Sequence, residues 1–161
     1  MNTLLNLENT ERILQEYAER LVSDYKDELI KSDRVATKNL INSIKYIYTK
    51  DNNSYEISLS LEDYWKYVEW DTKPHFPPIN KILEWVKAKP VLPVEYNGKL
   101  PTEKQLAFLI ARKISEVGTE GSHDLENTLD VLNKEYEEKI EEAITKDIDR
   151  SIGLVLVNYF K

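Results

Sequence analysis

Apolar residues of the N-terminal quarter recur every three or four positions, which predicts an amphipathic helix over residues 10–31. Asn9 or Thr10 is the expected N-cap of this helix. A second, shorter helix follows it. The apolar residues of the long helix are Ile13, Leu14, Tyr17, Ala18, Leu21, Val22, Tyr25 and Leu29, and those of the short helix are Leu40, Ile41 and Ile44.

The period then changes from helical to alternating, which predicts a half-buried antiparallel hairpin. Tyr46, Ile47 and Tyr48 are strand formers, and the segment 51–53, Asp-Asn-Asn, has the composition of a turn. After the turn, apolar and polar residues alternate from Ser54 to Leu61.

The stretch 63–89 combines three Trp with three Pro and predicts two helices separated by a turn. Tyr64, Tyr67 and Val68 have helical spacing, so a short helix is expected before Trp70. The pair Pro77-Pro78 suits the start of a second helix. The apolar stripe of that second helix consists of Ile79, Ile82, Leu83 and Val86.

Three prolines and the pair Asn97-Gly98 interrupt the segment 90–101 and exclude a long helix there. A small hairpin between Val91 and Leu100 is expected, turning at Asn97-Gly98. Thr102 and Gln105 then form a capping box at the start of a helix that Gly118 ends. The apolar face predicted for this helix consists of Leu106, Leu109, Ile110, Ile114 and Val117.

The last periodic segment predicts a helix over residues 123–150, about 40 Å long at roughly 1.5 Å per residue. Gly153 is expected to separate it from a β-prone apolar tail over residues 154–160. Such a tail could add a strand to a neighbouring subunit. The predicted helical stripe is Leu125, Leu129, Leu132, Tyr136, Ile140, Ala143 and Ile148, and the candidate interface residues of the tail are Leu154, Val155, Leu156, Val157, Tyr159 and Phe160.

These elements predict an α+β fold, with a small antiparallel sheet packed by several helices, a long C-terminal helix and a β-prone tail. At 161 residues the chain is expected to form a single domain, 1–161. Its parts are the N-terminal helix 10–31, a central α+β core 37–119, the long acidic helix 123–150 and the apolar tail 154–160.

Composition excludes several classes of protein. The chain has no Cys, which excludes disulfides and a Cys nucleophile. No apolar run reaches about 18 residues and no basic-then-apolar leader is present, so we expect neither a membrane span nor a signal peptide, and synthesis in a cytoplasm.

The net charge of −7 is concentrated near the C-terminus. Between His123 and Arg150 there are ten acids and four bases. No basic stripe of the kind that grips phosphates is present, which disfavours ordinary nucleic-acid binding. If the protein lined a channel for DNA, acidic walls would let the duplex pass without being held.

Two groups of side chains could carry chemistry, and both favour a structural interpretation. Glu69, Asp71 and His75 suggest a metal or acid–base site, but zinc catalysis usually needs three protein ligands and the chain has two His. Ser122, His123 and Asp124 are neighbours in sequence, which does not produce the geometry of a catalytic triad. We therefore expect no enzymatic activity, no cofactor and no metal.

The Trp and Tyr residues of the stretch 63–89 have two interpretations. Trp65, Trp70 and Trp85, with Tyr64 and Tyr67, could stack on bases or sugars. Aromatic clusters more often belong to a core or a protein interface, because each ring buries a large area. The four glycines form neither a Walker loop nor a dinucleotide-binding fingerprint.

Two blocks of this sequence resemble the tailed-phage head-to-tail joining proteins of the neck or tail-completion type. The first block is Tyr-x-x-Tyr-Val-Glu, a polar turn, Lys-Pro-His-x-x-Pro and Ile-x-x-Trp-Val-x-x-Lys, and the second is Ala-Phe-Leu-Ile-Ala-Arg-Lys-Ile-x-x-x-Gly-Thr. The resemblance covers roughly residues 37–125. Its matching positions are Tyr64, Tyr67, Val68, Glu69, Thr72, Pro74, His75, Pro78, Trp85, Ala107, Ala111, Ile114, Gly118 and Thr119.

One position departs from the pattern of that family. Its members usually carry Gly where this chain has Asp71, directly before Thr72. Asp tolerates the left-handed backbone conformation better than most residues, so we expect the turn to survive the change.

The resemblance implies a structural virion protein that forms a ring in the head-to-tail connector of a bacteriophage. The implied partners are further copies of the chain, six or twelve in a cyclic homo-oligomer, together with portal or adaptor proteins and tail proteins. Genome DNA would pass through the ring without specific binding, and no membrane would be involved. The protein would be assembled in the host cytoplasm and located at the neck, where tail and head join in the virion.

Two alternatives from other classes stay open. One is a non-enzymatic cytoplasmic adaptor or regulatory module that binds a protein through its Trp-rich face and its tail. The other is a metal-assisted hydrolase centred on Glu69, Asp71 and His75, in which replacement of His75 would abolish an activity while assembly is retained.

Overall fold

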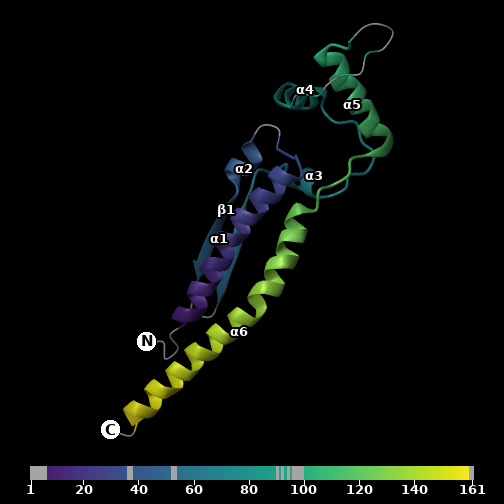
Figure 1. The fold of residues 1–161 in the computed structure, drawn as a ribbon. Helices are drawn as coiled ribbons and strands as arrows, with labels where there is room; N and C mark the ends of the chain where they lie inside the picture. The colour runs from purple at the N-terminus through teal and green to yellow at the C-terminus, as the bar shows by residue number, and fades with distance from the viewer. Residues whose placement is uncertain are drawn as a thin grey trace. The chain divides into compact units, whose positions relative to one another are not determined.

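The structure is a computed structural model that describes residues 7–35, 38–51, 54–89, 91, 93, 95 and 100–159. It is mostly helical, with one antiparallel two-stranded sheet and a long C-terminal helix, which confirms the predicted α+β class (Figure 1). In chain order the elements are α1 (Glu8–Lys31), α2 (Asn39–Ser43), β1 (Lys45–Lys50), β2 (Tyr55–Ser60), α3 (Trp65–Glu69), α4 (Ile79–Ala88), α5 (Glu103–Val117) and α6 (Asp124–Tyr159).

The chain forms two compact units, and it passes between them more than once. The first unit contains Met1–Asp27, Ile44–Ser60 and Leu125–Lys161, and the second contains Glu28–Ser43 and Leu61–Asp124. The first unit has 17 acids against 10 bases, whereas the second has 12 of each. The whole net charge of −7 therefore belongs to the first unit.

The predicted hairpin forms within the first unit. β1 and β2 pair antiparallel over their full length, with Tyr46 opposite Leu59 and Tyr48 opposite Ile57. These four side chains lie on one half-buried face, while Ile47 points to the other face and is 53% exposed. The Asp51 amide donates to the Ser54 carbonyl at 2.9 Å, and the predicted turn residues Asn52 and Asn53 lie outside the described residues.

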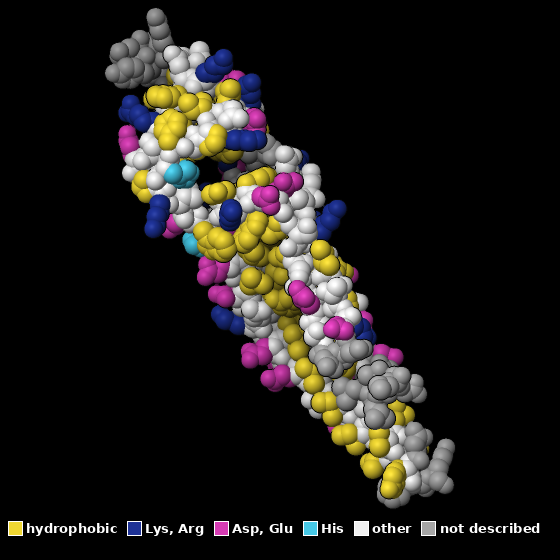
Figure 2. Space-filling view, turned by 180° about the vertical axis from the view of Figure 1, so that it is seen from behind, with side chains coloured by type: hydrophobic (Ala, Val, Ile, Leu, Met, Phe, Trp, Pro, Cys, Tyr) yellow, Lys and Arg dark blue, Asp and Glu magenta, His cyan; other side chains and the backbone are white. Residues whose placement is uncertain are grey.

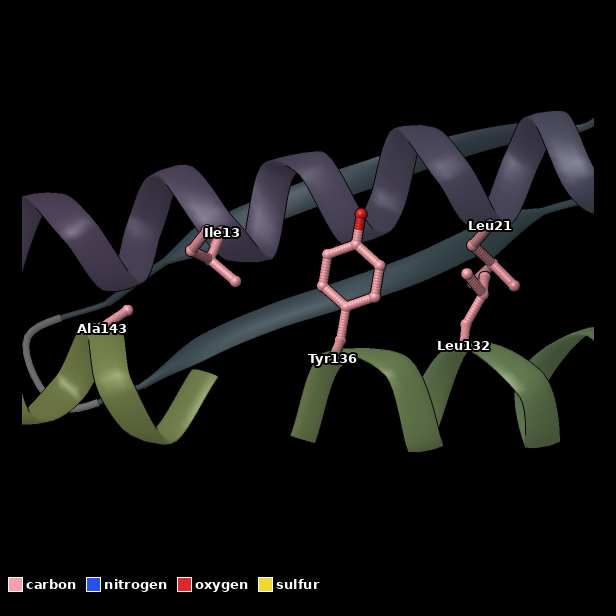
Figure 3. Packing of buried hydrophobic residues seen from close by; sticks show 5 residues of the cluster. All are labelled: Ile13, Leu21, Leu132, Tyr136 and Ala143. Atoms are coloured by element: carbon pink, nitrogen blue, oxygen red, sulfur yellow. The ribbon is translucent and has the colours of Figure 1, made fainter. Parts of the chain in front are cut away.

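The core of the first unit lies where α1 and α6 face each other, beside the hairpin (Figure 3). Leu59 of β2 packs against this core together with side chains from both helices. The buried members are Ile13, Leu21, Leu132, Tyr136 and Ala143, and the partly buried members are Tyr17, Leu59, Leu125, Leu129 and Ile140. Most of the apolar stripe predicted for the last helix is confirmed by this set.

Two tyrosines form hydrogen bonds that link α1 and α6 within the core. The rings of Tyr17 and Tyr136 meet edge to face, with centroids 5.4 Å apart. The Tyr136 hydroxyl donates to Glu16 Oε1 at 2.8 Å, and the Tyr17 hydroxyl donates to Asn133 Oδ1 at 2.8 Å. Burial, reinforced by the hydrogen bond to Glu16, raises the pKa of Tyr136 to about 12. Burial also raises the pKa of Tyr17, so both hydroxyls stay protonated and serve as donors between α1 and α6.

The N-terminus of α1 is capped by a side chain from the other end of the sequence. Asp147 of α6 is fully buried. Its Oδ1 accepts from the amide and the side chain of Asn9 at 3.1 and 2.7 Å, and its Oδ2 accepts from the amide and hydroxyl of Thr10, both at 2.8 Å. The prediction that Asn9 or Thr10 caps the helix is wrong, because both lie inside α1 and donate to Asp147.

Helix α6 continues through the segment that was predicted to be an extended tail. It runs without a break to Tyr159, so Leu154, Val155, Leu156, Val157 and Tyr159 are helical, and Phe160 lies outside the described residues. Gly153 lies inside the helix instead of ending it. A helix already formed over its preceding residues extends at little cost, and this outweighs the β propensity of Val and Leu. Ile148 was predicted to join the buried stripe, but it is 40% exposed and Asp147 takes that place.

In the second unit, α4 packs against α5. The capping box of Thr102 and Gln105 is present at the start of α5, and Gly118 ends it, as predicted. The buried face of α5 differs from the prediction, because Ala107 and Ala111 are fully buried while Leu109 and Val117 are exposed. Small side chains let packed helices approach closely, which favours burial of the alanine face of α5. The hairpin predicted for Val91–Leu100 falls mostly on residues outside the described part of the chain.

Within the residues that the structure describes, no helix is both long enough and apolar enough to cross a bilayer.

Replacing Asp147 with Asn should destabilise the protein by about 2 kcal/mol, because an amide cannot accept hydrogen bonds through both of its heavy atoms. Urea unfolding of the variant measures the loss. Asp149→Asn is the matched control, since Asp149 is exposed on the same helix and should change stability little. Equal stability of the two variants would contradict the capping role.

The same carboxylate predicts a pH dependence. Burial by itself raises the pKa of Asp147, but the hydrogen bonds from Thr10 and Asn9 outweigh it, so the pKa lies below its ordinary value. A lowered folded pKa gives stability that is complete above the unfolded pKa of about 3.9 and is lost as pH falls through the folded value. The difference in unfolding free energy between the native chain and Asp147→Asn should therefore shrink below about pH 4.

Replacing Gly153 with Ala should stabilise the protein by roughly 0.5–1 kcal/mol, because Ala is the better helix former. A Cβ at this position meets nothing within 4 Å. Circular dichroism and thermal unfolding check the gain. Unchanged helicity with a lower melting temperature would instead indicate that the last helix ends at Gly153, because Ala would be strained at a helix end.

Candidate functional site

The two sequence blocks that carry the family resemblance meet in the second unit. The loop after α3 and the loop after α5 pair through Thr72 and Thr119. The Thr72 amide donates to the Thr119 carbonyl at 2.9 Å, and the Thr119 amide donates to Thr72 Oγ1 at 3.0 Å. The two hydroxyl oxygens lie 2.7 Å apart. We refer to Thr72, Gly118 and Thr119 as the threonine clasp.

Gly118 is required by the geometry of the threonine clasp. It adopts a φ of +76°, a conformation that L residues rarely adopt. A Cβ built on Gly118 would lie 1.9 Å from the Thr72 carbonyl oxygen. Only glycine therefore lets the end of α5 approach the other loop this closely.

Three further hydrogen bonds extend the pairing of the two loops. Val68 and Glu69 accept, through their carbonyls, from the amides of Ser122 and His123 at 2.8 and 3.0 Å. A Cβ on Gly121 would lie 2.3 Å from the Glu69 carbonyl oxygen. The Gly121 amide in turn donates to Asp71 Oδ1 at 2.8 Å. These contacts hold the two loops together on both sides of Asp71.

Asp71 does not have the backbone conformation that was expected of it. The non-glycine residues with positive φ among the described residues are Asp33, Lys38 and His123. Asp71 instead contributes its carboxylate, which accepts from Gly121 and lies 3.8 Å from Nε2 of His123. Asp at this position therefore supplies a side-chain contact that Gly could not make.

The residues of the hypothetical metal or acid–base site serve separate contacts. Glu69 is 1% exposed, whereas Asp71 and His75 lie on the surface. Nδ1 of His75 donates to the Lys73 carbonyl at 2.8 Å, since a carbonyl can only accept. Within the part of the chain that the structure describes, no group of three His, Cys, Asp or Glu side chains is placed to hold a metal ion.

A shallow depression of about 450 Å³ lies beside the threonine clasp and is open to solvent. It is lined by Asp71, Thr72, Val117, Gly118, Thr119 and Glu120.

The prolines and α4 position the remaining residues of the first block. Pro74 and Pro78 are exposed, while Pro77 between them is buried. Pro78 is the N-cap of α4, and its carbonyl accepts from the amides of Lys81 and Ile82. Trp85 lies on α4 and is partly exposed, whereas Ala111 and Ile114 of α5 face inward.

The aromatic residues expose much of their surface. Trp65 and Trp70 contact each other with ring centroids 5.0 Å apart, while Tyr64 and Tyr67 lie exposed near them. A second pair, Phe76 and Phe108 at 6.3 Å, was not predicted. Phe108 lies outside the apolar face that was predicted for α5. An aromatic residue on the polar face of a helix was therefore the signal in the sequence that could have indicated this exposed pair. Both pairs favour the interpretation of a protein-binding surface over a closed core.

Replacing Gly118 with Ala should destabilise the protein by at least about 2 kcal/mol, because the new methyl group meets backbone rather than a side chain that can move. Unfolding followed by tryptophan fluorescence measures the loss of stability. Gly153→Ala is the matched control, since the same methyl group enters open space there. Equal effects of the two substitutions would exclude the close approach described here.

Comparison of the chain with known proteins gives no significant match. No family model matches it, and neither a curated protein nor a solved structure is significantly similar to it. The resemblance to phage head-to-tail joining proteins therefore rests on the residues of the two blocks.

Proposed function

We propose that this protein is a structural component of a tailed bacteriophage virion, forming a ring in the connector between head and tail. The observation that carries the proposal is the threonine clasp. Thr72 of the first block and Thr119 of the second are 47 positions apart in sequence. The residues that join the two blocks in space, Thr72, Gly118 and Thr119, are matching positions of the pattern.

The distribution of charge and apolar surface supports the same proposal. A ring subunit needs contact surfaces, and the second unit exposes aromatic side chains that include Tyr67, Trp70 and Phe76. Head-to-tail contacts between such surfaces generate a closed ring when the rotation from one subunit to the next closes on itself. The acidic first unit suits a wall past which DNA moves without being bound.

Native mass spectrometry of the purified protein, alone and with the portal and tail proteins encoded near it, tests the proposal. We expect a discrete ring or a defined complex with one of these partners. Tyr67→Ala and Trp70→Ala should weaken the complex at least tenfold if the exposed aromatic residues are central contacts. Glu103→Ala, at an exposed position of α5, is the control.

A clean monomer that binds neither partner at high concentration would overturn the proposal. Co-purification with a single host protein in the absence of virion components would instead favour the adaptor function, which the same exposed aromatic residues support. Strong, salt-dependent retention on DNA would contradict free passage of the genome.

A further inference from the structure

Helix α6 carries a second apolar stripe that is separate from the one facing α1. Its residues follow one another at steps of four, four, three and four, which places them on one face of a helix. They are Ile144 (39% exposed), Ile148 (40%), Ile152 (53%), Val155 (44%) and Tyr159 (84%). We refer to these five residues as the outer stripe.

The outer stripe begins at Ile144, where exposed apolar side chains appear on a second face of α6. Ala143 and Asp147 still face α1, but the residues one position further along, Ile144 and Ile148, point away from that contact. Figure 2 shows hydrophobic side chains gathered at its lower right end, over the C-terminal part of α6. Solvent exposure of so many large apolar groups on one helix marks an interaction surface.

The charge pattern of α6 restricts what can cover this stripe. From Glu126 to Glu142 the helix has seven acids and two bases, whereas from Ile144 to Tyr159 it has two of each. No charged residue follows Arg150 before Tyr159. A parallel pair of α6 helices would place the two acidic segments side by side. An antiparallel pair that overlaps only over 144–159 would direct them away from each other.

The exposed area is sufficient for such a pair. The outer stripe exposes roughly 500 Å² per copy, so two copies present up to about 1,000 Å², which reaches the lower limit expected of a biological interface. The overlap of 16 residues is about 24 Å long.

We propose that a second copy of this chain covers the outer stripe, through antiparallel pairing of the two α6 segments 144–159. In this arrangement Ile144 lies opposite Tyr159 of the other copy, and Ile148 lies opposite its Val155. Ile152 lies next to the two-fold axis. The contact is isologous and joins two copies only, so it goes beyond the ring proposed above and does not depend on it.

Substitutions at Ile152 test the pairing because the two copies of this residue meet at the axis. Lys and Glu are both good helix formers, so each variant should keep α6 intact. Sedimentation equilibrium should show a dimer for the native chain and at least tenfold weaker association for Ile152→Lys and for Ile152→Glu. An equimolar mixture of the two variants should dimerise again, because opposite charges then meet at the axis.

Val157→Lys is the matched control, since Val157 is 59% exposed on the opposite side of the helix and should leave the dimer unchanged. A native monomer at about 100 μM, an unchanged dimer in Ile152→Lys, or failure of the mixture to associate would each overturn the proposal. A monomer that gains a partner only with a portal or tail protein would assign the stripe to that protein instead.

Single cysteines establish the direction of the pair, since the chain has no Cys of its own. In an antiparallel pair, oxidation of a mixture of Ile148→Cys and Val155→Cys should yield mainly the mixed disulfide. Crosslinking of each variant only with itself would show a parallel pair and overturn the proposal. Ring formation with virion proteins should persist in Ile152→Lys, so the ring and the pair can fail independently.

Discussion

The buried carboxylate of Asp147 fixes how α1 and α6 meet, and the packing of the first unit depends on it. A buried charge is tolerated only where hydrogen bonds replace water, and Asn9 and Thr10 provide four. Away from Asp147, each successive contact joins an earlier residue of α6 to a later residue of α1. Ala143 lies near Ile13, then Tyr136 meets Glu16 and Tyr17, and Leu132 lies near Leu21 (Figure 3). A slip of one helical turn, about 5.4 Å, would leave the carboxylate without these donors, whereas apolar contacts alone would tolerate it.

The second unit depends on a different constraint, which is the close approach of two backbones. Gly118 and Gly121 leave room for the carbonyls of Thr72 and Glu69, and the loop hydrogen bonds form only at that distance. The glycines belong to the loop after α5, and the carbonyls belong to the end of α3 and the loop after it. The end of α5, the end of α3 and the start of α6 at Asp124 are thus fixed by a few backbone groups rather than by a large apolar core.

The sequence predicted the elements whose signals are local. The capping box of Thr102 and Gln105, the helix end at Gly118 and the alternation from Tyr55 onward each lie within a few residues of what they determine. The cap of α1 could not be predicted in this way, because Asp147 is 137 residues from Thr10 and resembles its many acidic neighbours. The sequence nevertheless contained one signal of this cap. The stripe through Tyr136 and Ala143 continues to position 147, where an acid on an otherwise apolar face indicates a buried, paired group.

The helical conformation of the last ten residues of α6 also depends on the hydrogen bonds of Asp147. Propensity alone favours a strand for Leu154 to Val157, and a free helix of this length would be marginal in water. The segment is helical because it continues a helix whose preceding turns are held by Asp147 and the core. Its exposed apolar surface makes that state costly unless something covers it. Anchoring at Asp147 and pairing along the outer stripe are therefore thermodynamically coupled. Whatever loosens the anchor lets the last turns fray and weakens the pair, and whatever covers the stripe stabilises the anchored helix in return.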